Sequence, residues 1–160
     1  CLRLGEQHGT PFRVIAVSSV LSIAPQKMKG AYCAAKSAMN TAHESFWFDE
    51  QASNSLESVS LVLPGPVVTR FREHALAALQ PLLGRASAVH REKYKAMEVA
   101  LAPGARIKPF TASASDVVKK IYSAAEATRP KPRYLVTPQT YAAEFITRFI
   151  PRSIQRIILR

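Results

Sequence analysis

Short apolar runs alternate with long helical segments in this sequence, and that alternation limits its possible folds more than any other feature. Residues 12–18 and 57–63 are apolar runs typical of buried strands. Between them, residues 31–51 contain neither Gly nor Pro and are rich in Ala, Met and Glu, which predicts a long helix. Strands separated by helices favour a parallel sheet with helical crossovers.

The second half continues this pattern. Residues 69–101 predict helix that is broken by Pro81 and Gly84. The pair Ser115-Asp116 predicts the N-cap of a further helix.

A third strand and a terminal helix complete the chain. Residues 133–137 are the strand, and Pro138 opens the helix, which Pro151 interrupts. Three strands form only part of a sheet, so we expect residues 1–160 to be one incomplete α/β domain. The first strand is expected to lack a neighbour on one side, since its apolar residues do not suit an exposed edge.

The cysteine and histidine content indicates the compartment of the protein and whether it binds a metal. The two cysteines, Cys1 and Cys33, form no metal or redox spacing, which favours a reducing compartment without disulfides. The four histidines share no ligand spacing, so no metal site is expected. The opening segment resembles neither a signal nor a transit peptide, and we expect the chain to be a piece of a longer protein. We expect it in the cytoplasm or peripheral to an intracellular membrane.

The net charge of +11 suits a phosphorylated cofactor, an anionic membrane or nucleic acid. Nucleic acid is not expected as a partner, because no recognised motif or stacking aromatic cluster accompanies the charge.

Three residues have the chemistry and the spacing of a proton-transfer site. Ser19 ends the first strand, and Tyr32 and Lys36 stand four residues apart on the helix that follows, so they share one face. A neighbouring ammonium stabilises a phenolate, which allows such a tyrosine to exchange a proton with an alcohol or carbonyl oxygen. A serine at the carboxyl end of a strand can hydrogen-bond the same oxygen.

The second strand ends in the segment PGPVVT, residues 64–69. Carboxyl ends of parallel strands are where open α/β sheets bind ligands. Gly65 has no side chain, so a flat ring is expected to approach the backbone there.

Taken together, the serine, the YxxxK pair and PGPVVT resemble the short-chain dehydrogenases/reductases. The segment RPKPRYLVTP is similar to the last strand of the hydroxysteroid-dehydrogenase-like branch. The resemblance implies the last three strands of a Rossmann-like doubly wound parallel sheet. It also implies Tyr32 as general acid/base, Ser19 as the residue that orients the substrate oxygen, and Lys36 as the residue that holds the nicotinamide ribose and tunes the tyrosine.

The same resemblance implies NAD or NADP as cofactor, with a slight preference for NADP. The cofactor site would comprise Tyr32, Lys36, Pro64 and Gly65, with the backbone near Val67 on the carboxamide and Thr69 on the carboxamide or the phosphates. The implied reaction moves a hydride between nicotinamide and a secondary alcohol or carbonyl. The full-length parent is expected to be a homo-oligomer.

Residues 70–101 occupy the position of the family's variable substrate cover. Their apolar side chains either line a lipophilic pocket or pack as core; a pocket would suit a steroid, retinoid or fatty substrate. The apolar residues in question are Phe71, Leu76, Leu79, Leu82, Leu83, Tyr94 and Met97.

The chain departs from the family in one respect. Its six glycines are scattered, and neither the glycine-rich phosphate turn nor the asparagine of the family's catalytic tetrad has a counterpart. We therefore expect the isolated chain to be inactive, because hydride transfer requires the cofactor to be held against the substrate.

Residues 138–160 predict a basic amphipathic helix. Two sets of side chains recur every four residues there: Arg148, Arg152, Arg156 and Arg160, and Ile146, Ile150, Ile154 and Ile158. Such a helix can lie on an anionic membrane surface, cap the domain or bind a partner. The alternative function is therefore a non-catalytic, truncated relative that acts as an interaction or membrane-surface module.

Overall fold

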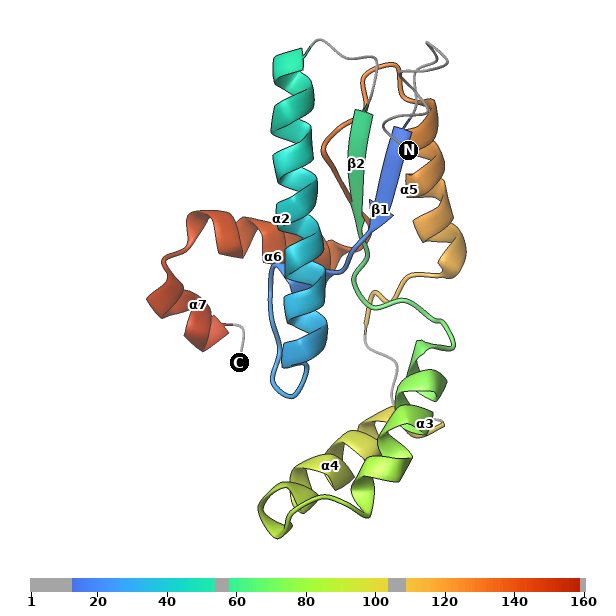
Figure 1. Ribbon diagram of the computed structural model, residues 1–160, viewed down its shortest axis with the longest axis vertical. Helices are drawn as coiled ribbons and strands as arrows, with labels where there is room; N and C mark the ends of the chain where they lie inside the picture. The colour runs from blue at the N-terminus through green and yellow to red at the C-terminus, as the bar shows by residue number, and fades with distance from the viewer. Residues whose placement is uncertain (1–12, 54–57, 104–108, 159–160) are drawn as a thin grey trace.

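The computed structural model describes residues 13–53, 58–103 and 109–158. Its sheet has three parallel strands in the order β1-β2-β3: β1 (Arg13–Val17), β2 (Ser58–Leu63) and β3 (Arg133–Leu135). Figure 1 shows α2 (Gly30–Ser53) on one side of the sheet and α5 (Ala114–Glu126) on the other. Helices on both faces of a parallel sheet confirm the predicted partial Rossmann-like fold.

The core is centred on β2. Leu61, Val62 and Leu63 are fully buried, as expected for the central strand of a sheet that is covered on both faces. In contrast, β1 pairs only with β2 among the described residues, and its Val14 and Val17 are exposed. The expectation of a first strand without a second neighbour is thus met. The expectation that this strand is buried was wrong, because nothing in the described chain covers its free side.

Helix α5 begins with a capping box. Ser113 is the N-cap: its Oγ accepts from the backbone N–H of Asp116, and the Asp116 carboxylate accepts from the backbone N–H of Ser113. The predicted cap at Ser115 was wrong by two residues. At the other end of α5, Arg13 Nη1 donates to the carbonyl of Ala124, which ties the helix to β1.

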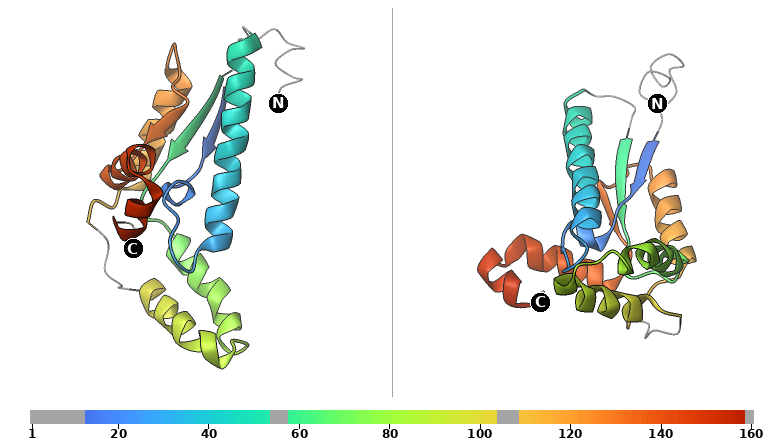
Figure 2. Two further views of the ribbon diagram at one scale, coloured as in Figure 1. Left: turned by 90° about the vertical axis from the view of Figure 1, so that its left-hand side faces the viewer. Right: turned by 60° about the horizontal axis from the view of Figure 1, so that its bottom comes forward.

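Two antiparallel helices form a hairpin beyond the carboxyl ends of the strands: α3 (Phe71–Leu83) and α4 (Ala88–Leu101) (Figure 2). The helical prediction for this region is confirmed, but the break lies at Gly84 and not at Pro81. Pro81 stays inside α3, two residues before the helix ends, although it has no N–H to donate to the carbonyl of Ala77. Leu79 is buried, whereas Phe71 and Leu82 remain exposed, so this segment is only partly core.

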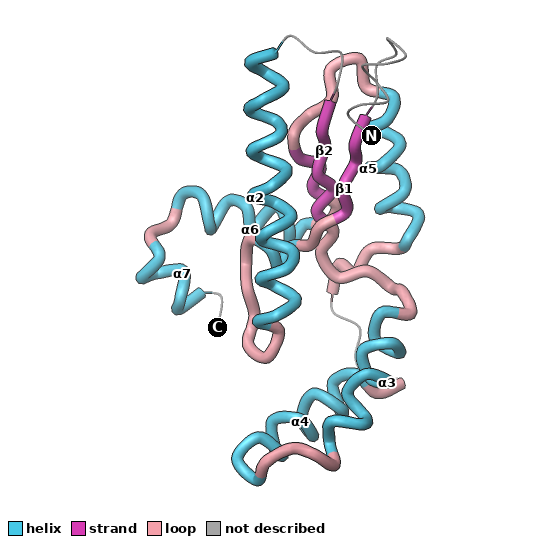
Figure 3. Tube along the Cα trace, in the orientation of Figure 1, coloured by secondary structure: helices cyan, strands magenta, loops and turns pink. Residues whose placement is uncertain are grey.

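The chain ends in α6 (Pro138–Phe149) and α7 (Arg152–Ile158), which are separated at Ile150 and Pro151 as predicted (Figure 3). Pro138 occupies the first turn of α6, where its missing N–H costs nothing. No helix in the described residues is both long and apolar enough to cross a membrane.

One arginine ties three elements together. Arg133 at the start of β3 pairs with Glu144 of α6 at 2.9 Å and also with Glu44 of α2. Glu144 and Arg133 are mostly covered, so the charge-assisted hydrogen bond between them is shielded from solvent. The contact fixes α6 against the same side of the sheet as α2.

Candidate active site

The candidate site begins where β1 ends. Ser18 N donates to Val62 O at 2.8 Å, and Val20 N donates to Pro64 O at 2.7 Å, so the chain after β1 runs alongside the end of β2. Ser19 lies between these two bonds. The structure therefore brings Ser19 and Pro64 together at the carboxyl ends of adjacent parallel strands, as the sequence predicted.

Ser19 is buried and begins the short 3-10 helix η1 (Val20–Ser22). Its Oγ accepts from the backbone N–H of Leu21 at 3.2 Å. A hydroxyl also carries one donor proton. Within the described chain no acceptor for that proton is found, so Ser19 is able to donate to a bound oxygen.

Lys36 reaches the same place from α2. Its Nζ donates to Val17 O at 3.0 Å, at the last residue of β1 and two residues before Ser19. An ammonium has three donors, and this bond uses one of them. Helix α2 thus places the ammonium of Lys36 at the carboxyl end of β1.

Tyr32 lies one helical turn before Lys36 and is half-buried. Its ring packs edge-on against Phe71 at the start of α3, with ring centroids 5.7 Å apart. In the described residues no hydrogen bond joins its hydroxyl to Ser19 or Lys36. Convergence of the Tyr32 and Ser19 hydroxyls on one point stays a prediction.

A buried amide that the sequence did not predict links the site to α2. Asn40 Oδ1 accepts from Ser18 Oγ at 2.6 Å, while Asn40 Nδ2 donates to Ser22 Oγ at 2.7 Å. Ser22 Oγ in turn donates to the carbonyl of Ser19. The available signal was spacing: Asn40 follows Tyr32 and Lys36 by further helical turns, so all three share one face of α2.

Gly65 packs against two buried threonines, a contact that the sequence did not predict. A Cβ at this position would lie 2.0 Å from Thr137 Oγ1 and 3.1 Å from Thr140 Oγ1. Both threonines are fully buried, and their hydroxyls are 3.0 Å apart. Glycine is required here because Thr137, which follows β3, packs against the turn. The approach of a flat ring to the backbone at Gly65 stays a prediction.

Val67 pairs with Ala112 in a parallel bridge: Ala112 N donates to Pro66 O at 2.9 Å, and Val68 N donates to Ala112 O at 3.0 Å. Alternate residues of an extended segment direct their backbone groups to opposite sides. The N–H and C=O of Val67 therefore face away from Ala112. Thr69 lies farther along, and its Oγ1 accepts from Phe71 N at 3.3 Å at the start of α3.

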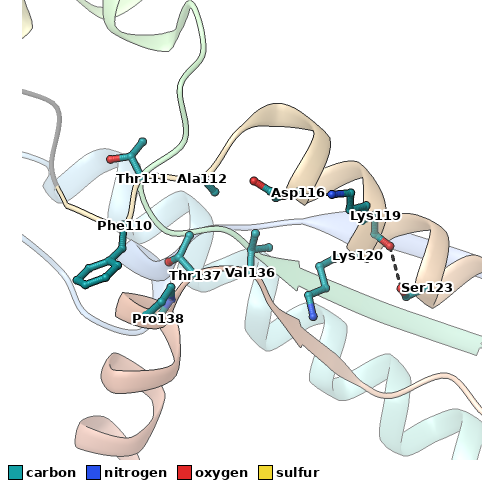
Figure 4. Close-up of a pocket in the computed structure, with 10 residues that line it drawn as sticks. All are labelled: Phe110, Thr111, Ala112, Asp116, Lys119, Lys120, Ser123, Val136, Thr137 and Pro138. Atoms are coloured by element: carbon teal, nitrogen blue, oxygen red, sulfur yellow. Dashed lines mark hydrogen bonds and ion pairs between the residues drawn. The ribbon is translucent and has the colours of Figure 1, made fainter.

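A hollow of about 460 Å³ lies elsewhere, between the start of α5, the end of β3 and the start of α6 (Figure 4). Thr137 lines it, but Ser19, Tyr32 and Lys36 do not. One of its two lysines, Lys119, pairs with Asp116 at 3.6 Å across one turn of α5. The hollow therefore lies apart from the three proposed proton-transfer residues, although Thr137 contacts Gly65 and Ala112 pairs with Val67.

His43 lies on α2 beyond Asn40 and is buried. Burial lowers its pKa below the ordinary value of 6.5, the backbone of Val59 opposes this shift, and the guanidinium of Arg133 adds to it. A buried imidazole with a lowered pKa is part of the core of the fold rather than of the candidate site.

Comparison with known proteins gives a distant match. No family model matches the sequence. The chain is 29% identical over 151 residues to the proteins named uncharacterized oxidoreductase YbbO in Escherichia coli strain K12 and strain O6:H1. The alignment covers 92% of this chain and 48% of each relative, so the chain spans about half the length of the curated relatives it matches.

Proposed function

We propose that this chain carries the proton-transfer half of an oxidoreductase site of the short-chain dehydrogenase/reductase type. The observation that carries the proposal is the bond from Lys36 Nζ to Val17 O at 3.0 Å. It holds the lysine beside Ser19, with Tyr32 one turn away on the same helical face. The name of the distant relatives, oxidoreductase, supports the same class of reaction.

Each side chain then has a distinct role. Ser19 donates its free hydroxyl proton to the substrate oxygen, and that bond strengthens as negative charge develops there. Tyr32 gives a proton to this oxygen in reduction and takes it back in oxidation. Lys36 stabilises the phenolate that Tyr32 becomes once it has released its proton.

The residues present fit the nicotinamide side of NAD or NADP, which supplies or accepts the hydride when bound. Two donors of Lys36 remain for the ribose hydroxyls. The outward-facing N–H and C=O of Val67 match the acceptor and donor of a carboxamide. Thr69 follows Val67 by two residues in the same loop, and its hydroxyl is proposed to bind the carboxamide or the phosphates.

The substrate is proposed to be a lipophilic alcohol or carbonyl compound. Phe71 touches Tyr32 and opens α3, so the helical hairpin starts directly at the proposed reaction centre. Its apolar side chains Phe71, Leu82, Val89 and Val99 are exposed and are available to cover an apolar molecule.

Nicotinamide mononucleotide tests this proposal without the rest of the dinucleotide. Saturation-transfer NMR should detect contact of its nicotinamide protons with the chain, and Lys36→Met should weaken the signal at least about fivefold, as the loss of a charged hydrogen bond predicts. Lys27→Met is the matched control, and adenosine monophosphate is the control probe. Equal signals from both nucleotides, or no loss in Lys36→Met, would contradict the proposal and favour the non-catalytic alternative.

A further inference from the structure

Helix α6 buries small side chains and exposes aromatic ones. Thr140 and Ala143 face the protein and are 0% and 5% exposed, whereas Tyr141, Phe145 and Phe149 are 53%, 61% and 67% exposed. Surface helices normally show the opposite arrangement. The rings of Phe145 and Phe149 lie 5.1 Å apart, and Tyr141 precedes Phe145 by one helical turn; we call these three exposed residues the aromatic ridge.

The charge beside the aromatic ridge is of one sign. Arg148 is three residues after Phe145 and shares its face of α6, and Arg152 is exposed at the start of α7. The acid of this segment, Glu144, points inward and pairs with Arg133 at 2.9 Å. Between residues 138 and 155 the outward surface thus combines aromatic rings with arginines and carries no carboxylate.

The ridge is placed where a flat surface can reach it. Figures 1 and 2 show α6 leading away from the sheet and α7 turning beside it, so that the pair projects from the body of the molecule. Gln155 Nε2 donates to Ile150 O at 2.6 Å, which fixes the turn between the two helices. Within α6 and α7, the large exposed apolar side chains are these three aromatics and Ile154. Of the predicted isoleucine stripe, Ile146 and Ile150 are half-buried.

We propose that the aromatic ridge and its arginines bind the surface of an anionic lipid bilayer, with α6 lying in the headgroup plane. Aromatic rings are favoured at the boundary between headgroups and acyl chains. Guanidinium groups pair with lipid phosphates, and basic residues near an anionic leaflet each strengthen binding. The net charge of +11 also attracts the whole chain to a negatively charged bilayer over a longer range.

Vesicle flotation tests this binding, because aggregated protein sinks while vesicle-bound protein rises. The probes are phosphatidylcholine vesicles with and without about 30 mol% phosphatidylserine, an anionic content that attracts basic segments. We expect the chain to float with the anionic vesicles and to be released by high salt. Arg148→Gln with Arg152→Gln should lower the affinity about fivefold per arginine.

Matched variants distinguish binding through the aromatic ridge from binding through overall charge or through any exposed apolar surface. Phe145→Ala with Phe149→Ala should lower vesicle affinity at least about tenfold, by removing apolar area from the interface. Phe46→Ala with Phe48→Ala removes two exposed rings from α2 and should change nothing. Arg85→Gln with Arg91→Gln removes the same charge from the helical hairpin and should weaken binding far less than the Arg148 and Arg152 pair.

Insertion of the aromatic ridge into the bilayer can be measured separately, by tryptophan fluorescence. With the single tryptophan replaced by Trp47→Phe, a Phe145→Trp reporter should shift its emission to the blue and be quenched by brominated lipids. Failure of the chain to float with anionic vesicles would overturn the proposal. Equal losses in the α2 control, or an unquenched reporter on bound protein, would overturn it as well.

Discussion

Ser18 Oγ donates to Asn40 Oδ1 over 2.6 Å, and this bond joins the end of β1 to the inward face of α2. Through Ser22, the same amide also holds the carbonyl of Ser19. The position of Ser19 relative to Tyr32 and Lys36 therefore depends on a residue that does not itself face the proposed substrate.

Asn40→Ala should destabilise the protein by about 2 kcal/mol, because it leaves the buried hydroxyl of Ser18 with only the long contact to the carbonyl of Lys36 at 3.4 Å. Urea denaturation followed by circular dichroism measures the change. Thr41→Ala is the control, since Thr41 is exposed and bonds only within its helix. A cost equal to that of the control would mean that the buried network adds no stability.

Gly65→Ala should destabilise the fold by about 2 kcal/mol or more, because its Cβ would overlap Thr137 Oγ1. Combining it with Thr137→Ala should recover part of that loss, with a coupling of about 1 kcal/mol in a double-mutant cycle. Gly84→Ala, where a Cβ meets nothing within 4 Å, should be neutral or slightly stabilising. Additive effects at Gly65 and Thr137 would show that the contact is not the cause.

Stability should fall as the pH drops below 6.5 because of His43. Its pKa is lowered in the folded protein by burial, so the unfolded chain binds a proton over a pH range in which the folded chain does not. The contribution of His43 is complete above pH 6.5 and is lost as the pH falls toward its lowered folded pKa. Denaturant titrations from neutral to acidic pH should show a flatter profile for His43→Gln than for the wild type. Parallel profiles would rule out this histidine as the source.

The exposed edge of β1 should drive self-association. An open strand edge with apolar side chains is a template for pairing with another chain. Val14→Lys should therefore raise the monomer fraction in sedimentation velocity, whereas Val89→Lys on α4, a more exposed valine away from the sheet, should not. A wild-type chain that stays monomeric at high concentration would contradict the expectation.

The local features of the fold were predictable, and the long-range contacts were not. Periodicity and Gly-Pro positions indicated the strands and helices to within a few residues, since they report local backbone preference. The cap at Ser113 was readable in principle, because its partner Asp116 lies three residues later.

Other site features arise only on folding. The need for glycine at Gly65 comes from Thr137, which is distant in sequence and reaches the turn only when β3 pairs with β2. The aromatic ridge of α6 was likewise hidden, because its periodicity does not say which face packs inward. The inward pairing of Glu144 with Arg133 decides this.

The bridge between Val67 and Ala112 pins together the two points at which the chain leaves and rejoins the body around the helical hairpin. The helical hairpin thus leaves and rejoins the domain at neighbouring points. Replacing it with another segment is expected to leave the sheet, Ser19 and Lys36 in place. Because Phe71 contacts Tyr32 where the hairpin begins, exchanging the hairpin alone is predicted to alter substrate preference while it leaves the proposed proton-transfer residues unchanged.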